Sequence, residues 1–391
     1  MDDEPLVLRS VRRLLALRQP GWDVAFAESG TEALELVARG PAVDAVVSDM
    51  NMPGMSGAAL LARIQAEHPA TIRIVLSGQS DPVQVFRAVP SAHQFIRKPF
   101  EAGALEATIA GALAVRARLP TDALRALVGG AGILPAPPST YLRLTHALSR
   151  DETSLAELVP LVESDVALTA RLLQIGASPV LGLPRGSVDL LGIVLHLGVD
   201  ALRALVLGFG LAQAFPVARP PRGLSLGEFE AHSLCVGGLA RTLLRGDPAA
   251  DDALLAGVLH DSGRLLLAAV APARFAEIDE LVARESLPPP SAELRVLGVT
   301  HAGLAAALFA LWGIPIGIVE AVETHHGTPD QMRSKVARAV HVANRLAHDP
   351  DVPVDAENAA GIHPAALDGI AAAALARARA TARDALGTAA A

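Results

Sequence analysis

Short apolar runs that alternate with amphipathic segments occupy only the first part of the chain, and this division constrains the fold most. The runs are WDVAFAE (22–28), VDAVVSD (43–49), IRIVLSG (72–78) and HQFIRKP (93–99), and a segment with helical spacing follows each of them. Strands that alternate with helices predict a parallel sheet with helices on both faces. We therefore expect an α/β, doubly wound domain over residues 1–118.

After about residue 118 the apolar spacing becomes helical, and Pro/Gly-rich breaks such as LPAPP, LGLPRG and LPPPS separate the segments. Hydrophobic residues make up 51% of the chain and aromatic residues only 3%, so Ala, Leu and Val must build the core, which favours closely packed helices. A single core rarely grows beyond about 250–300 residues, so a second domain is expected. We predict an all-α bundle over residues 119–348. The Ala-rich segment 349–391 is either a docked terminal helix or a frayed one.

Charge and cysteine content exclude several classes of protein. The formal net charge of −8 offers no broad basic surface, so nucleic acid is not expected as a partner. The single cysteine, Cys235, rules out an intramolecular disulfide, and the N-terminus lacks a signal-peptide pattern, so a cytoplasmic location is expected. The uncharged run 302–319 has the length of a membrane span, but Gly313 and Pro315 interrupt it. We predict two buried helices there and no membrane association.

Polar residues stand at the ends of the predicted strands, where open parallel sheets bind ligands. They are Asp49, Ser77 and Lys98, with the pair Asp2 and Asp3 at the start of the chain. Several carboxylates share such an edge only when a divalent cation offsets their repulsion, and oxygen ligands favour Mg²⁺. A carboxylate beside a metal and a lysine is suited to accept a phosphoryl group.

The motifs DDEP, DMNMPGMSG, LSG and FIRKP, in this order, resemble those of a two-component receiver domain with a flavodoxin-like fold. The resemblance implies that Asp49 is the phosphoacceptor and that a sensor histidine kinase supplies the phosphoryl group. It also implies that Asp2, Asp3, Asp49 and the carbonyl of Asn51 form a Mg²⁺ site. Ser77 would donate a hydrogen bond to the phosphoryl group, Lys98 would pair with it, and Phe95 would be the aromatic switch residue.

The acidic pair normally follows a complete first strand, whereas here it follows only Met1. That strand would be central in a parallel sheet, and its loss would remove hydrogen-bond partners from its neighbours. We expect that the true start lies upstream and that Met1 is an internal valine whose GTG codon was read as an initiator. The intact mass of the native protein tests this expectation.

Histidines recur in or at the ends of the helices predicted for the second half. His260 and Asp261 are adjacent in LLAGVLHDSGRLLL, and the other candidates are His232, His301, His325, His326 and Asn344. A bundle can direct such side chains into one pocket, and imidazole with carboxylate favours Fe, Mn or Zn over Mg²⁺ alone. A metal site and a set of satisfied core or surface histidines both fit this pattern.

The pattern is similar to the HD superfamily of metal-dependent phosphohydrolases. The long helical preface with DVALTARLLQIGAS makes the region from Leu119 to His348 resemble an HDOD domain, an HD-like bundle often found as a signalling output. Three departures weaken catalysis: Asn344 replaces the family's final aspartate, Arg264 replaces the lysine of HDxGK, and HHGTPD lacks the Gly-Tyr-Pro continuation of HD-GYP phosphodiesterases. A degenerate site that still binds metal is the preferred interpretation.

The leading hypothesis is therefore a response regulator that is phosphorylated on Asp49 and signals through a non-catalytic HDOD domain to an output protein still to be identified. One alternative is an enzyme in which phosphorylation gates a metal-dependent phosphohydrolase or phosphodiesterase acting on a nucleotide or cyclic dinucleotide. Another is a scaffold whose receiver forms a homodimer.

Overall fold

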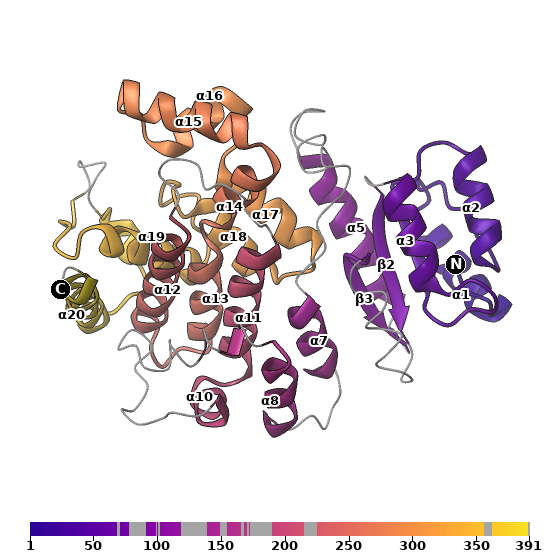
Figure 1. The fold of residues 1–391 in the computed structure, drawn as a ribbon, viewed down its shortest axis with the longest axis horizontal. Coiled ribbons are helices and arrows are strands. Elements are labelled where there is room, and N and C mark those ends of the chain that lie inside the picture. Colours follow the sequence, from indigo (N-terminus) through magenta and orange to yellow (C-terminus); the bar gives the residue numbers. More distant parts are fainter. Residues whose placement is uncertain are drawn as a thin grey trace. The chain divides into compact units, whose positions relative to one another are not determined.

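The computed structural model describes residues 1–68, 71–77, 91–98, 100, 102–118, 139–148, 155–165, 168–169, 172, 190–214, 225–355 and 362–389. It divides into two compact units (Figure 1). The first comprises Met1–Ser139 with Ala307–Gly313, and the second comprises Thr140–Ala306 with Ile314–Ala391.

A three-stranded parallel sheet forms the centre of the first unit, with the order β1-β2-β3. The strands are β1 (Ala45–Asp49), β2 (Ile72–Ser77) and β3 (Gln94–Arg97). Ile72, Ile74 and Val75 of the middle strand are fully buried, as expected for β-branched side chains covered on both faces. The register aligns Asp49 with Leu76, so the carboxyl ends of β1 and β2 meet at one edge.

Helices α1 (Pro5–Arg18), α2 (Gly30–Arg39), α3 (Gly57–Glu67) and α5 (Ala102–Arg118) flank this sheet (Figure 1). Helix α1 packs against α5, whereas α2 packs against α3, and α3 also contacts β1. The predicted α/β domain with a parallel sheet is therefore confirmed. Serine caps define two of the helix starts, since Ser29 and Ser56 each accept a backbone N–H from the first turn that follows.

The strand predicted over residues 22–28 is wrong, because this segment has no strand conformation. A strand needs a neighbour that supplies ladder hydrogen bonds, whatever its side chains favour. Among the described residues, one backbone hydrogen bond joins this segment to the chain beside β1: the N–H of Asp2 donates to the Ala27 carbonyl at 3.4 Å. Met1 lies between this segment and β1, where its ammonium group donates to the Val47 carbonyl and its own carbonyl accepts from Asp49.

The second unit is helical, as predicted. The helices from α7 onward are α7 (Ser139–Leu148), α8 (Leu155–Glu163), α10 (Leu190–Leu197), α11 (Val199–Ala214), α12 (Leu226–Leu243), α13 (Ala250–Leu259), α14 (Ser262–Val270), α15 (Pro272–Glu285), α16 (Pro289–Leu297), α17 (His301–Leu311), α18 (Ile316–Thr324) and α19 (Lys335–His348), followed by the short 3₁₀ helix η2 (Pro364–Leu367) and α20 (Ala372–Ala389). Ser139 of α7 and residues 307–311 of α17 are grouped with the first unit.

Helices α12 and α13 form the centre of this bundle and approach each other closely at two glycines. A Cβ atom on Gly257 would lie 2.6 Å from Cα of Gly237, which excludes any larger residue without a backbone shift. Around them, α13 also packs against α11, α18 and α19. This close approach lies near the C-terminal end of α13, which the candidate ligands His260 and Asp261 follow.

The apolar run 302–319 is divided between α17 and α18, as the sequence predicts. Gly313 adopts a φ of +73° after the first helix, and Pro315 precedes the second. Among the described residues, no single helix combines the length and apolar character that a membrane crossing requires, although two bent helix pairs meet those two criteria.

The Ala-rich C-terminal segment contains a docked helix, which decides between the two alternatives for residues 372–389. Helix α20 packs against α12 and α19, with Ala378 and Ala382 fully buried. Arg379 ties it to the preceding loop by donating to the Pro350 and Val352 carbonyls.

Candidate functional sites

At the carboxyl edge of the sheet, two of the aspartates that the sequence predicted there contact one lysine. Lys98 Nζ lies 2.6 Å from Oδ1 of Asp49 and 2.6 Å from Oδ2 of Asp2. Both aspartates are buried, and Lys98 is largely covered. Although burial opposes it, the two carboxylates raise the pKa of Lys98, so the ammonium form is held between them.

The loop after β1 is folded back so that Asp49 stays in place. The backbone N–H of Asn51 donates to Oδ2 of Asp49 at 3.0 Å, and the N–H of Gly57 donates to the Met50 carbonyl. A Cβ on Gly57 would lie 2.0 Å from the Asp49 carbonyl oxygen, so only glycine fits there. Gly57, the last residue of MPGMSG, is thus required by the close return of the chain to the strand end.

The remaining receiver candidates are Asp3, Asn51, Ser77 and Phe95. Asp3 is half-buried and Asn51 is exposed. Ser77 ends β2 and Phe95 pairs in register with Val75, but the side chains of Ser77 and Phe95 lie outside the part of the chain that can be described. The sequence assigned Asp2 to a cation site and Lys98 to a phosphoryl group, whereas the structure pairs these two side chains directly.

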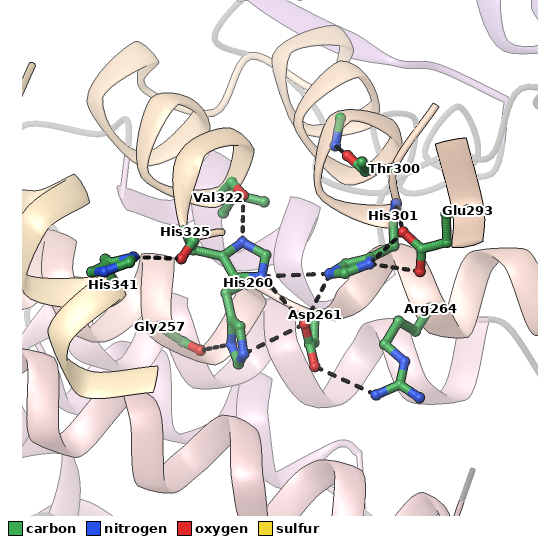
Figure 2. Close-up of polar contacts among 11 residues, drawn as sticks. Gly257, His260, Asp261, Arg264, Glu293, Thr300, His301, Val322, His325 and His341 are labelled. Atoms are coloured by element: carbon green, nitrogen blue, oxygen red, sulfur yellow. Dashed lines mark hydrogen bonds and ion pairs between the residues drawn. The ribbon is translucent and has the colours of Figure 1, made fainter. Parts of the chain in front are cut away.

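In the helical unit, imidazoles from three helix junctions converge on Asp261 (Figure 2). Oδ1 of Asp261, between α13 and α14, lies 3.1 Å from Nε2 of His301 at the start of α17. It also lies 3.4 Å from Nε2 of His325, which follows α18. Nε2 of His260, at the end of α13, is 3.5 Å away.

Two overlapping groups of these side chains have metal-ligand spacing. Within each group the donor atoms lie within 4.8 Å of one another, and Asp261 belongs to both. The first group is Asp261, His301, His325 and His326, and the second is His232, His260 and Asp261. Every histidine that the sequence proposed for this site therefore belongs to one of the groups.

Two buried polar atoms in this centre lack a hydrogen-bond partner within the described chain. They are Nε2 of His260 and Oδ1 of Asn344, on residues that are 0% and 5% exposed. Buried polar groups are rarely left unsatisfied, because their desolvation then goes uncompensated. Both are lone-pair donors to a cation, so the residues present fit a metal ion.

Backbone carbonyls orient the histidine rings. Nδ1 of His260 lies 2.7 Å from the Gly257 carbonyl, and Nδ1 of His325 lies 2.7 Å from the Val322 carbonyl. A carbonyl only accepts, so Nδ1 carries the hydrogen in both rings, and Nε2 is the atom presented to Asp261. The ligand geometry thus follows from the way α13 and α18 end.

The electrostatics favour the metal-binding forms of His260 and Asp261. Burial lowers the pKa of His260 to about 3, so this imidazole is neutral. Burial works against ionisation of Asp261, but the surrounding histidines hold its pKa well below the ordinary value. His301 differs, because Asp261 and Glu293 overcome the effect of burial and raise its pKa to about 9.

Sequence reasoning missed several residues around this centre. Glu293 is buried against His301, Nδ1 of His341 lies 2.9 Å from the His325 carbonyl, and the ring of His348 is centred 4.8 Å from that of His232. His348 follows Asn344 by one helical turn, so helical spacing could have identified it. An isolated glutamate such as Glu293 carried no signal.

Arg264 and Cys235 also lie near this region. Arg264 Nη1 is 3.9 Å from Oδ2 of Asp261, so the arginine that replaces the family's lysine faces the same carboxylate. Cys235 is half-buried and belongs to neither metal-ligand group among the described residues, and burial raises its pKa to about 11.

Comparison with known proteins finds two family matches. A model described as a response regulator receiver domain matches residues 1–110, and a model described as an HDOD domain matches residues 134–328. A solved HDOD domain protein of unknown function from Geobacter sulfurreducens is 22% identical, with a TM-score of 0.51 over 67% of this chain and 96% of that chain. At this identity the likeness shows the fold alone.

Two curated relatives match one part of the chain each. An uncharacterized protein of Treponema pallidum is 25% identical over 197 residues, which is 50% of this chain and 38% of the relative. The probable transcriptional regulatory protein TcrX of Mycobacterium tuberculosis is 31% identical over 102 residues, 26% of this chain and 42% of the relative. The chain thus spans less than half the length of either relative.

Proposed function

We propose that a sensor histidine kinase phosphorylates this chain, which belongs to the response regulators, on Asp49. Its receiver domain covers residues 1–110 and its HDOD domain covers residues 134–328. The HDOD domain is then the output. The observation that carries the proposal is the contact of Lys98 with Asp49 at 2.6 Å, beside the buried carboxylate of Asp2. A lysine in this position offsets the charge of a phosphoryl group on the aspartate.

Mg²⁺ fits the same edge, because its ligands in proteins are oxygen atoms. Asp2, Asp3, Asp49 and the backbone carbonyl of Asn51 would hold it. When bound, the ion offsets the negative charge that gathers around the transferred group. Ser77 would donate a hydrogen bond to the phosphoryl oxygens, and Phe95 would change its packing in response, which couples the edge to the surface of the receiver.

Labelling with radioactive acetyl phosphate tests the phosphoacceptor. We expect the wild-type protein to incorporate acid-stable, base-labile label in the presence of Mg²⁺, as an acyl phosphate does. Asp49→Asn should abolish incorporation. Asp23→Asn is the matched control, because Asp23 is an exposed aspartate of the same domain. Labelling that persists in Asp49→Asn would reject the assignment.

We further propose that the HDOD domain holds Fe, Mn or Zn at the two groups that share Asp261. The residues that would bind are His232, His260, Asp261, His301, His325, His326 and Asn344. Support comes from the convergence of Nε2 atoms on one carboxylate and from the unpartnered atoms of His260 and Asn344. Metal analysis of the native protein tests it, since His260→Ala should lower the metal content of the purified protein.

The output is proposed to act by binding a partner protein without turnover. Asn344 contributes a neutral oxygen where the HD superfamily has a carboxylate, which removes one negative charge from the centre and weakens its hold on a cation. The second candidate is a phosphohydrolase or phosphodiesterase acting on a nucleotide or cyclic dinucleotide. The specific observation in its favour is that two ligand groups share Asp261, since paired metals suit phosphoester hydrolysis.

An activity assay separates the two candidates. Bis-(4-nitrophenyl) phosphate and cyclic di-GMP are incubated with the purified protein and added Mn²⁺ or Fe²⁺. Partner binding without turnover leaves both substrates intact. Hydrolysis that disappears in His260→Ala and in Asp261→Ala would establish the enzyme instead.

The proposed organisation keeps a receiver over 1–118, an HDOD domain over 119–348 and a C-terminal segment over 349–391. The proposed partners are a sensor kinase and an output protein, with dimerisation of the receiver as a third contact. We propose a cytoplasmic location and no role in nucleic-acid binding. A pull-down that compares phosphorylated with unphosphorylated protein would identify an output partner that depends on Asp49.

A further inference from the structure

Glu293 is a buried carboxylate that belongs to neither metal-ligand group. It lies in α16 with 2% of its surface exposed. Both of its oxygens lie 2.8 Å from Nδ1 of His301, and Oε2 also accepts the backbone N–H of His301 at 2.8 Å. Carboxylates are rarely buried without such donors, so the position of Glu293 is tied to His301.

This contact determines which nitrogen of His301 can bind a cation. An ionised carboxylate only accepts hydrogen bonds, so Nδ1 must carry a hydrogen, and the lone pair of a neutral ring is then on Nε2. Nε2 is the atom that lies 3.1 Å from Oδ1 of Asp261 and 3.4 Å from Nε2 of His325. Figure 2 shows His301 between Glu293 and Asp261, with its two nitrogens facing them.

We infer that Glu293 is a positioning residue that holds His301 as an Nε2 ligand for the metal centre. Partners of this kind orient the ring and raise the basicity of the nitrogen that binds. The inference rests on the proposed metal centre. A backbone contact also restrains His301: Gly263 lets the His301 backbone approach α14 so closely that a Cβ there would lie 2.0 Å from the His301 carbonyl oxygen.

Glu293→Gln distinguishes this role from simple capping of α17. The amide oxygen of glutamine can still accept the backbone N–H of His301, so the start of the helix keeps its partner. Its NH₂ group then takes the place of Oε1, 2.8 Å from Nδ1, where it can only donate. A ring that accepts this bond on Nδ1 carries its hydrogen on Nε2. The variant should fold, but His301 would present a hydrogen to the metal position.

Titration of the metal-free, full-length protein with Co²⁺ tests the inference through affinity and the visible absorption of the bound ion. We expect Glu293→Gln to bind about 10–100-fold more weakly, with an absorption spectrum that indicates one ligand fewer. Glu285→Gln is the matched control, since Glu285 pairs with exposed arginines, and it should bind as the wild type does. Glu293→Asp, which keeps the carboxylate, should recover part of the affinity.

The double variant Glu293→Gln, His301→Ala should bind no more weakly than His301→Ala alone, because Glu293 acts only through that ring. Wild-type affinity and spectrum in Glu293→Gln would overturn the inference while leaving the metal centre intact. Loss of the helical circular dichroism of metal-free Glu293→Gln would assign Glu293 to folding and overturn it as well. No Co²⁺ binding by the wild type would instead overturn the metal centre, and the inference with it.

Discussion

Lys98 joins the phosphoacceptor candidate Asp49 to the rest of the carboxyl edge, because its Nζ atom lies 2.6 Å from Oδ1 of that aspartate. The same ammonium group contacts Asp2 at 2.6 Å. Two buried carboxylates therefore share one cation. The ammonium group of Met1 also interacts electrostatically with both aspartates.

Replacement of Lys98 by methionine should destabilise the protein in the absence of Mg²⁺. It removes the ammonium group that contacts both Asp2 and Asp49 and leaves the Met1 ammonium group to offset part of their charge, which should cost about 1–3 kcal/mol of unfolding free energy. Saturating Mg²⁺ should restore part of the loss. Urea denaturation with and without Mg²⁺ measures both effects. Lys335→Met is the control, since its ion pair with Asp247 is more exposed and should contribute less. Unchanged stability of Lys98→Met without Mg²⁺ would contradict this account.

Gly263→Ala should disrupt the start of α17 and with it the metal centre. The added Cβ would lie 2.0 Å from the His301 carbonyl oxygen, so the backbone must shift, at a cost of about 1–3 kcal/mol. Thermal unfolding and Co²⁺ binding should both be weakened. Gly303→Ala, within α17 itself, is the control, because its Cβ would make only ordinary contacts at 3.4 Å or more. Equal behaviour of the two variants would argue against the close approach.

Asn344→Asp should strengthen Mn²⁺ binding. Its Oδ1 atom is buried without a partner among the described residues, and a charged oxygen there would add a carboxylate to the centre. The metal-free variant should be less stable than the wild type, because burial of an uncompensated charge is unfavourable. Isothermal titration with Mn²⁺ and thermal unfolding of the metal-free protein are the measurements. A variant with unchanged Mn²⁺ affinity would show that Asn344 lies outside the coordination sphere.

Cys235 should react slowly with thiol reagents at neutral pH. Burial raises its pKa to about 11, and since the thiolate is the reactive form, only about one molecule in a thousand is ionised at pH 8. The alkylation rate should rise about tenfold per pH unit up to the pKa of the thiol. Iodoacetamide labelling across pH 7–10 measures this, with the urea-unfolded protein as the fast control. A rate that levels off below pH 9 would contradict the raised pKa.

The sequence predicted the three strands and the polar residues at their carboxyl ends, because short local patterns determine both. The runs that became β1, β2 and β3 lie within the predicted segments, and Asp49 and Lys98 were predicted at strand ends that meet in space. The segment 22–28 had the same pattern and formed no strand. Its side chains favour extended backbone, but strand formation depends on a neighbouring chain, which local sequence does not reveal.

The helical site was predicted in its histidines but not in its supporting contacts. His260, His301 and His325 stand out because imidazole is rare in an apolar helix end. The partner of His301 is Glu293, which lies in a different helix and whose burial results only from the packing of α16. The pairing of Lys98 with Asp2 was missed for a similar reason, since the two residues are 96 positions apart. Contacts of this kind depend on tertiary packing, which pattern and spacing do not encode.

The most direct measurement of the central claim is fluorine NMR of the protein mixed with beryllium fluoride, which mimics a phosphoryl group on a carboxylate. If Asp49 is a phosphoacceptor beside Lys98, the wild type should show bound fluorine resonances that require Mg²⁺, and Asp49→Asn should show none. Bound resonances that persist in Asp49→Asn, or a wild-type protein without any in saturating Mg²⁺, would contradict the claim.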